Sequence, residues 1–145
     1  VGDGPARASL EEHARKQGIP ERLTITGIVG REDVTRHVTS FDIAVLPDVT
    51  PYSSPLKLFE YLQLGSAIVA PDMENIREIL TDGHDALLFA KEPGALEAAL
   101  LKLCADASLR ARLGTAARQT IRTSMDTSAG RRKMFLSEPT VALTA

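Results

Sequence analysis

Short apolar runs alternate with amphipathic stretches along most of the chain. Three continuous apolar runs are typical of strands buried on both faces of a sheet, and they cover residues 43–46, 67–70 and 86–89. A β-branched run predicts a further strand at 23–26, ended by Gly27. Apolar residues at helical spacing predict helices over 6–17, 31–40, 55–64, 75–80, 93–105 and 108–123. Strands separated by helices form parallel βαβ units, so the sequence predicts an α/β fold with an open parallel sheet.

The predicted topology indicates where a ligand would bind. In open parallel sheets the binding crevice lies beyond the carboxyl ends of the strands. The segments that follow the predicted strands are 27–30, 47–54, 71–75 and 90–92. Binding residues are therefore expected in these four segments and in the helices that follow them.

Composition narrows the class of protein. The 145 residues are 43% hydrophobic and 25% charged, with a net charge of -2, which is typical of a folded globular chain and not of a disordered one. No apolar run is long enough for a membrane-spanning helix. The single cysteine, Cys104, excludes an internal disulfide and suits a reducing compartment, so we expect a cytoplasmic protein. With no tryptophan and six other aromatic residues, the chain is a poor platform for nucleic-acid bases, and we expect no nucleic-acid partner.

Positive charge is concentrated near the C-terminus. Residues 107–133 contain seven basic side chains and one acidic side chain, whereas residues 1–106 contain ten and seventeen. Such a segment could contact an anionic partner, nucleic acid or the inner face of a membrane, and a peripheral membrane contact is kept open. The simpler hypothesis is a solvated helix face.

The helix predicted at 55–64 carries the strongest functional signal. Ser54 suits its N-cap, Pro55 its first turn, and Gly65 the residue after its end. It is apolar nearly all round, so we expect it to be largely buried, with Lys57, Glu60 and Gln63 on one polar stripe. The free N–H groups of its first turn could hold a diphosphate. An exposed Lys57–Glu60 ion pair with no ligand explains the same spacing equally well.

Several segments in unbroken order carry a family resemblance. They are 1–5, 42–47, 54–62, 65–70, 76–83, 86–89, 109–114 and 117–118. Together they resemble the C-terminal, donor-binding domain of family-four retaining glycosyltransferases of the GT-B fold, over about residues 1–122. The resemblance implies a Rossmann-like doubly wound sheet with helices on both faces, in which 1–125 form part of a nucleotide-sugar-binding domain and 126–145 a basic segment and loose tail.

The resemblance also implies a site. The family's ribose-binding glutamate corresponds to Glu60, and its base-contacting loop to Gly27, Ile28 and Val29. The loop that presents backbone N–H groups to the donor's phosphates or sugar corresponds to Ser53, Ser54, Pro55 and Leu56. We add Lys57 as a contact to the diphosphate because it shares the polar stripe with Glu60. The implied reaction moves a sugar from a nucleotide-diphosphate-sugar donor, with retention of configuration, to an acceptor sugar or lipid-linked sugar. It needs no essential metal ion, and we expect no cofactor.

Two departures from the family pattern affect the prediction. Tyr52 occupies the position of a second, common glutamate, which we interpret as a subfamily variant. The family's diphosphate-binding Arg and Lys, and its acceptor-binding domain, would precede Val1. We therefore expect the first βα unit of the domain to be missing here and the fragment alone to be inactive. A GT-B nucleotide-sugar epimerase and a non-catalytic nucleotide-sugar-binding module remain alternatives.

Other single residues have ordinary explanations. Cys104 is expected to be a small core residue, and the three histidines to lie on the surface without a metal. Asp72 follows a predicted strand, so it is either a loop or helix-cap carboxylate or a contact to the donor sugar. Glu78 matches a family glutamate, and a helix-surface role suits it equally well.

Overall fold

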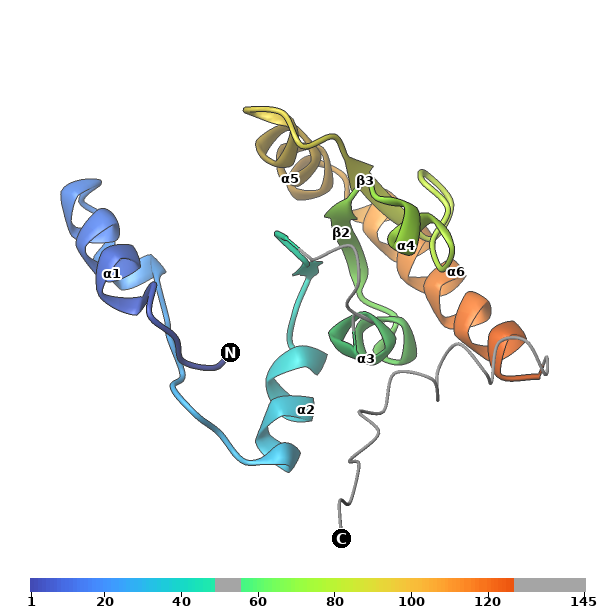
Figure 1. Cartoon of the computed structure of the whole chain (residues 1–145), viewed down its shortest axis with the longest axis horizontal. Helices are drawn as coiled ribbons and strands as arrows, with labels where there is room; N and C mark the ends of the chain where they lie inside the picture. Colours follow the sequence, from blue (N-terminus) through green and yellow to red (C-terminus); the bar gives the residue numbers. More distant parts are fainter. Residues whose placement is uncertain (49–55, 127–145) are drawn as a thin grey trace, which may run out of the picture. The chain divides into compact units, whose positions relative to one another are not determined.

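The structure is a computed structural model that describes residues 1–48 and 56–126 (Figure 1). It divides into two compact units, Val1–Ser40 and Phe41–Ala145.

The first unit contains helices but none of the expected sheet. Its elements are α1 (Arg7–Lys16), the short 3₁₀ helix η1 (Pro20–Arg22) and α2 (Arg31–Thr39). The predicted helices at 6–17 and 31–40 are confirmed, whereas the strand predicted at 23–26 is wrong. Next to the predicted strand, Gly27 forms an isolated antiparallel bridge with Gly2, which is a single pair of residues and not a strand. A strand requires a partner for its backbone groups, and residue-level β propensity cannot supply one.

The second unit is built on a parallel sheet. Its strands are β1 (Ile43–Val45), β2 (Ala67–Pro71) and β3 (Ala86–Phe89), in the order β1-β2-β3. Ala44 pairs with Ile68, and Val69 pairs with Leu87. The helices of this unit are α3 (Leu56–Leu64), α4 (Glu74–Arg77), α5 (Ala95–Ala105) and α6 (Ala107–Asp126). The predicted strands and their parallel arrangement are confirmed.

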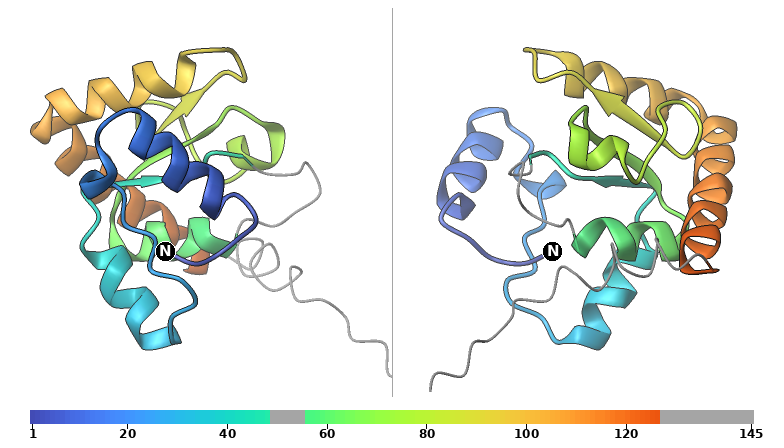
Figure 2. Two further views of the ribbon diagram at one scale, coloured as in Figure 1. Left: turned by 90° about the vertical axis from the view of Figure 1, so that its left-hand side faces the viewer. Right: turned by 45° about the vertical axis from the view of Figure 1, so that its right-hand side comes forward.

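The central strand β2 is buried on both faces. All five of its residues are buried. Alternate positions Ala67 and Val69 join a core cluster whose other buried members are Leu87, Phe89, Leu103, Leu109 and Leu113. Because α5 and α6 supply the last three, these helices cover one face of the sheet (Figure 2). Ile68 and Ala70 point to the opposite face by the two-residue period of a strand, and they are also fully inaccessible.

The helices of the second unit differ from the predictions in detail. α4 spans only Glu74–Arg77, shorter than the predicted 75–80, and the chain beyond it forms turns. Cys104 is exposed at the end of α5, so its predicted place in the core is wrong. The buried residue of that helix is its neighbour Leu103. The apolar composition of α5 concealed which side faces the sheet.

Candidate functional site

Helix α3 lies between β1 and β2 in the chain, so its first turn is at the carboxyl edge of the sheet. Leu58, Tyr61 and Leu62 form its buried face. The side chains of Lys57, Glu60 and Gln63 are exposed, as expected for one polar stripe. Leu56 differs from the prediction, because its side chain is 59% exposed although it is apolar. The apolar residues of α3 are therefore not all buried.

The buried face of α3 keeps this stripe directed to the outside. Leu58 and Leu62 are completely inaccessible, and Tyr61 is 8% exposed. Burial raises the pKa of Tyr61, and the negative charge of the adjacent Glu60 raises it further. Tyr61 therefore stays neutral at physiological pH and anchors the helix as an apolar side chain. Turning α3 to hide Glu60 would expose these three residues, which fixes the orientation of the stripe.

The C-terminal end of α3 is closed by a local motif and by a distant arginine. Gly65 has a φ of +67°, and its N–H donates to the carbonyl of Leu62 at 3.1 Å while the N–H of Ser66 donates to that of Tyr61 at 3.1 Å. These two bonds form the Schellman motif predicted by a glycine after the helix. Arg118 of α6 adds a third bond, from Nη2 to the carbonyl of Leu64 at 2.8 Å.

Two ion pairs involve residues that come after the strands of the sheet. Asp72, directly after β2, receives two hydrogen bonds from the guanidinium of Arg77, and the bond from Nη2 measures 2.5 Å. This contact lowers the pKa of Asp72. Lys91, after β3, contacts Asp48, after β1, with its Nζ 2.6 Å from the carboxylate oxygen. The carboxyl edge of this sheet is thus lined by charged pairs.

An open depression lies beside the Asp72–Arg77 pair. Its volume is about 500 Å³, and Asp72, Glu74, Arg77 and Glu78 line it. Of the two roles expected for Asp72, the ion pair supports the loop-stabilising one, since both carboxylate oxygens are engaged by Arg77. Glu78 lies on the rim of the same depression.

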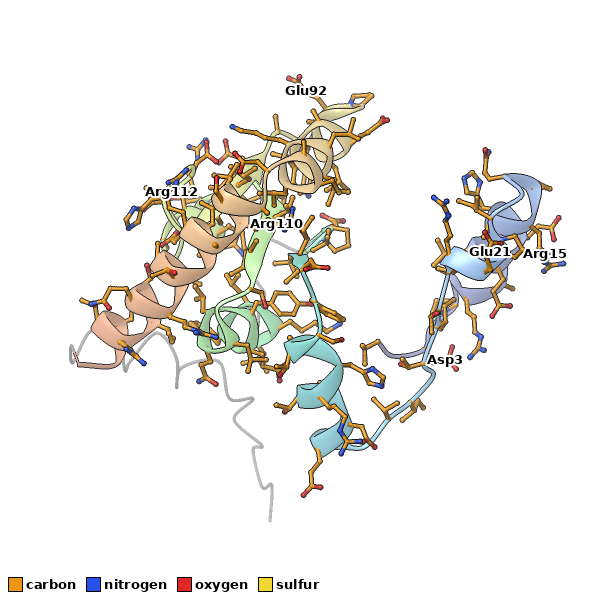
Figure 3. The ribbon with its side chains drawn as sticks, turned by 180° about the vertical axis from the view of Figure 1, so that it is seen from behind. Asp3, Arg15, Glu21, Glu92, Arg110 and Arg112 are labelled. Atoms are coloured by element: carbon orange, nitrogen blue, oxygen red, sulfur yellow. The ribbon has the colours of Figure 1, made fainter. Side chains whose placement is uncertain are left out.

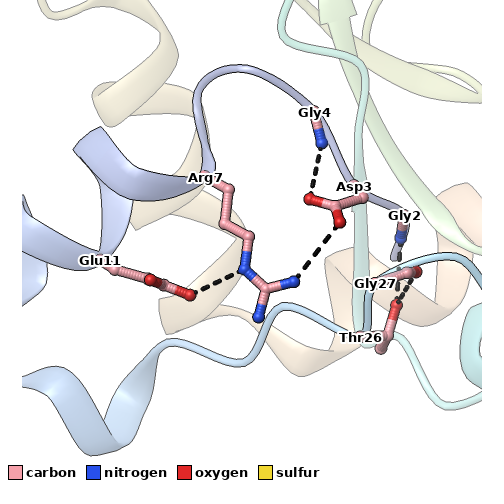
Figure 4. A network of polar contacts seen from close by, with 7 residues as sticks. All are labelled: Gly2, Asp3, Gly4, Arg7, Glu11, Thr26 and Gly27. Atoms are coloured by element: carbon pink, nitrogen blue, oxygen red, sulfur yellow. Dashed lines mark hydrogen bonds and ion pairs between the residues drawn. The ribbon is translucent and has the colours of Figure 1, made fainter.

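The predicted base-contacting loop lies in the first unit. Gly27 has a φ of +71°, a conformation that suits glycine, and Ile28 is 92% exposed. The N–H of Gly2 donates to Oγ1 of Thr26 at 3.0 Å, which ties the start of the chain to this loop (Figure 4). Val29 is half-buried.

A chain of charged contacts steadies the segment that precedes α1. Asp3 accepts from the N–H of Gly4 at 2.9 Å and lies 3.5 Å from Nη1 of Arg7. Arg7 in turn donates from Nε to Glu11 at 2.9 Å (Figure 4). The carboxylates of Glu11 and Asp3 raise the pKa of Arg7, with Glu11 contributing most. Asp3 is therefore committed to local contacts within the first unit.

The predicted site residues fall into three groups. Leu56, Lys57 and Glu60 are brought together on α3. Gly27, Ile28 and Val29 lie in the first unit. Ser53, Ser54 and Pro55 lie outside the described residues, as does Tyr52.

Three of the basic side chains predicted to form a surface near the C-terminus contact the rest of the fold, and the part of that segment at 127–133 lies outside the described residues. Arg110 donates to the carbonyls of Leu103 and Cys104 at 2.6 and 3.3 Å, at the end of α5. Arg112 donates to the carbonyl of Gly83 at 2.9 Å and leaves α6 on another side (Figure 3). With Arg118, three of the four arginines of this helix thus bind backbone carbonyls, a role that neither the solvated-face nor the partner-binding hypothesis included.

Sequence reasoning also missed a buried carboxylate. Asp85 is 2% exposed, and it accepts from the N–H of Thr81 at 2.7 Å and from the hydroxyl of Thr120 at 2.6 Å. It thereby joins the turn before β3 to α6. The turn-forming sequence around Gly83 gave no signal for this role, because Thr120 is 35 residues away.

Among residues 1–48 and 56–126, no group of three or more His, Cys, Asp and Glu side chains is placed to hold a metal ion. Within the same residues, no helix has the length and apolar character needed to cross a membrane.

Comparison with known proteins decides the family. A family model described as "Glycosyl transferases group 1" matches residues 1–106. The chain belongs to this family. Proteins of the family transfer sugars, and the match confirms the resemblance found in the sequence.

Two curated relatives are also glycosyltransferases. The chain is 28% identical over 89 residues to an alpha-D-kanosaminyltransferase of Streptomyces kanamyceticus, which covers 61% of this chain and 22% of that protein. It is 33% identical over 49 residues to a 2-deoxystreptamine glucosyltransferase of the same organism, which covers 34% of this chain and 13% of that protein. The chain therefore spans less than a quarter of the length of these relatives.

A solved structure shows the same fold. Sucrose-phosphate synthase from Thermosynechococcus elongatus aligns with a TM-score of 0.70 at 20% identity, over 83% of this chain and 30% of that one. At this identity the likeness concerns the fold alone. Family and fold together confirm the expected C-terminal domain of a GT-B glycosyltransferase.

Proposed function

We propose that this glycosyltransferase domain binds a nucleotide-diphosphate-sugar donor and that the whole protein transfers the sugar with retention of configuration. The observation that supports this most directly is the exposed stripe of α3, with Lys57 and Glu60 on a helix whose other face is buried. A polar stripe at the carboxyl edge of a parallel sheet is suited to a ligand.

Glu60 is proposed to bind the donor's ribose. A carboxylate can accept hydrogen bonds from both hydroxyls of a vicinal diol. Glu60 is exposed, and the burial of its neighbours Tyr61 and Leu62 prevents α3 from turning it inward. The helix therefore presents a hydrogen-bond acceptor in a constant direction.

Lys57 and the first turn of α3 are proposed to stabilise the diphosphate. Lys57 precedes Glu60 by one turn and lies nearer the N-terminus of the helix, where the free N–H groups and the dipole favour an anion. The base is proposed to contact the loop of Gly27, Ile28 and Val29, whose exposed isoleucine offers an apolar surface.

In the proposed reaction, an acceptor hydroxyl attacks the anomeric carbon from the face that the diphosphate leaves. The bond from the anomeric carbon to the diphosphate oxygen breaks, the bond to the acceptor oxygen forms, and the hydroxyl proton passes to the departing phosphate. Charge accumulates on the diphosphate, where Lys57 and the helix N-terminus would stabilise it. The acceptor, a sugar or lipid-linked sugar, would be held by another domain of a cytoplasmic protein.

Calorimetry on the full-length protein tests the ribose assignment. It measures the Kd of UDP, GDP and ADP, and then the Kd of the 2′-deoxy form of whichever nucleotide binds most tightly. Wild type should prefer the ribonucleotide by about tenfold or more, since a hydrogen bond to a charged group contributes about 1.5–3 kcal/mol. Glu60→Gln should weaken the ribonucleotide and remove most of this preference. Glu97→Gln, at an exposed glutamate of α5, is the matched control and should change neither.

Two outcomes would contradict the proposal. If Glu60→Gln keeps the full preference for the ribonucleotide, Glu60 does not bind the ribose. If wild type binds none of the three nucleotides, the nucleotide-sugar donor itself is wrong. Retention is tested separately by NMR detection of the sugar anomer released from the donor, and release of the opposite anomer would argue against it.

A further inference from the structure

The end of α3 farthest from the proposed donor site is held by α6. Leu109, Leu113, Ala117 and Ile121, spaced four residues apart, form the buried face of α6. Arg118, the residue after Ala117, donates from Nη2 to the carbonyl of Leu64, the last residue of α3. The two residues are 54 positions apart in the sequence, so this bond is a tertiary contact between the two helices.

The bond reaches a carbonyl at the C-terminal end of α3 that lies outside the Schellman motif. The Schellman bonds satisfy the carbonyls of Leu62 and Tyr61 but not that of Leu64. A guanidinium at this position also places positive charge at the negative end of the helix dipole. Arg118 therefore supplies a hydrogen bond to the carbonyl of Leu64 and a favourable charge at the end of the helix dipole, and no residue of α3 supplies a positive charge there.

The junction has little room to shift. A Cβ atom built on Gly65 would lie 2.3 Å from Nε of Arg118, and one built on Gly114 would lie 2.2 Å from the carbonyl oxygen of Gly65. The side chain of Arg118 thus lies directly over Gly65, and the backbone of α6 at Gly114 is in contact with the backbone of Gly65, the residue directly after α3. These close contacts restrict movement of the C-terminal end of α3.

Glu60 lies one helical turn before Leu64, so a shift or tilt at the end of α3 carries Glu60 and the first turn with it. We propose that Arg118 is a positioning residue for the donor site: through the carbonyl of Leu64 it sets where α3 presents Glu60 and Lys57. This inference rests on the proposed function, since it assigns Arg118 a role in placing the residues that bind the donor. Arg118 itself is not proposed to touch the ligand.

Arg110 supplies a matched control. It is an arginine of the same helix that donates to the terminal carbonyls of a helix, but that helix is α5, which carries none of the proposed site residues. Replacing either arginine by methionine keeps an unbranched apolar stem and removes the guanidinium. If capping matters only for stability, the two variants should affect nucleotide binding alike.

The experiment measures the Kd of whichever of UDP, GDP and ADP binds the full-length protein most tightly, together with urea unfolding of each variant. Arg118→Met should raise this Kd by about five- to tenfold, in the range by which residues remote from a ligand change its binding, while Arg110→Met should change it by less than about twofold. Arg118→Lys keeps the charge and a donor, and it should recover most of the lost affinity. Should Arg118→Met fail to fold, Arg118→Gln against Arg110→Gln, which also removes the charge, carries the comparison and should show the same difference in Kd.

A double-mutant cycle separates positioning from general stability. If Arg118 acts by placing Glu60, then Arg118→Met in the Glu60→Gln background should cost clearly less affinity than in wild type. Additive losses, or equal losses for Arg118→Met and Arg110→Met, would overturn the positioning role and leave the donor site intact. Absence of nucleotide binding in wild type would overturn the proposed function and this inference with it.

Discussion

Gly114 occupies the middle of α6 at its contact with Gly65, the residue directly after α3. In most helix interiors, replacing glycine by alanine stabilises the helix by about 1 kcal/mol, because alanine restricts the unfolded chain and shields the backbone. The substitution Gly114→Ala should have the opposite sign here. An added Cβ would lie 2.2 Å from the carbonyl oxygen of Gly65, and its next neighbour in the contact is a backbone carbon at 3.2 Å.

The size of the effect follows from this geometry. Carbon atoms of this kind essentially never approach closer than 3.0 Å, so α6 and Gly65 must separate by about 0.8 Å. Both partners are backbone, and no flexible side chain can yield. Overpacking of this kind costs about 1–3 kcal/mol, and the same movement lengthens the bond from Arg118 to Leu64, worth about 1 kcal/mol. After subtracting the gain in helix propensity, we expect a net loss of about 1–3 kcal/mol in the free energy of unfolding.

Urea unfolding followed by circular dichroism measures this loss. Ala111→Gly, at an exposed site one turn earlier in α6, is the control and should cost about 1 kcal/mol from propensity alone. If Gly114→Ala proves as stable as wild type, or more stable, the close contact between α6 and Gly65 does not exist. A loss restricted to Ala111→Gly would refute the reasoning in the same way.

Three further predictions concern other parts of the second unit. In NMR experiments the Asp72 carboxyl should titrate below its ordinary pKa because of its hydrogen bonds with Arg77, and Arg77→Met should raise that midpoint; an unchanged midpoint would argue against the pair. Because the pKa of Asp72 is lower in the folded state, the pair stabilises the fold above the pKa of the unfolded state, and this stabilisation is lost as pH falls through the folded pKa. Leu58→Ala should lower the free energy of unfolding in urea by about 2–5 kcal/mol, since the side chain is completely inaccessible. Leu101→Ala, at a leucine that is 62% exposed, should lower it by less than about 1 kcal/mol, and equal losses would contradict the assigned core. Asp85→Ala should cost about 2 kcal/mol or more because two donors lose their acceptor, and Asp85→Asn, which keeps one oxygen, should cost less; the reverse order would contradict the described bonds.

Local patterns were sufficient for most of the second unit. The three apolar runs became parallel strands because each is too apolar to lie at a surface and each is separated from the next by a helix. The same local logic identified Gly65 as the end of α3 and placed Glu60 on an exposed stripe. It failed at 23–26, where β-branched residues lack a neighbouring strand in the described part of the first unit, and at Cys104, where a helix apolar on several sides gave no direction.

The sequence by itself determined which segments are helices and strands in the second unit and where α3 ends, and it predicted which residues of α3 bind a donor. Tertiary structure decided how the charged residues of α6 are used. Arg118 and Arg112 bind carbonyls that lie 54 and 29 residues earlier, and Gly114 must lack a side chain because Gly65 lies against it. No local pattern distinguishes such an arginine from one on a solvated surface, because its partner is a backbone atom that any residue carries. Only the packing of α6 against α3 and the sheet brings the two together.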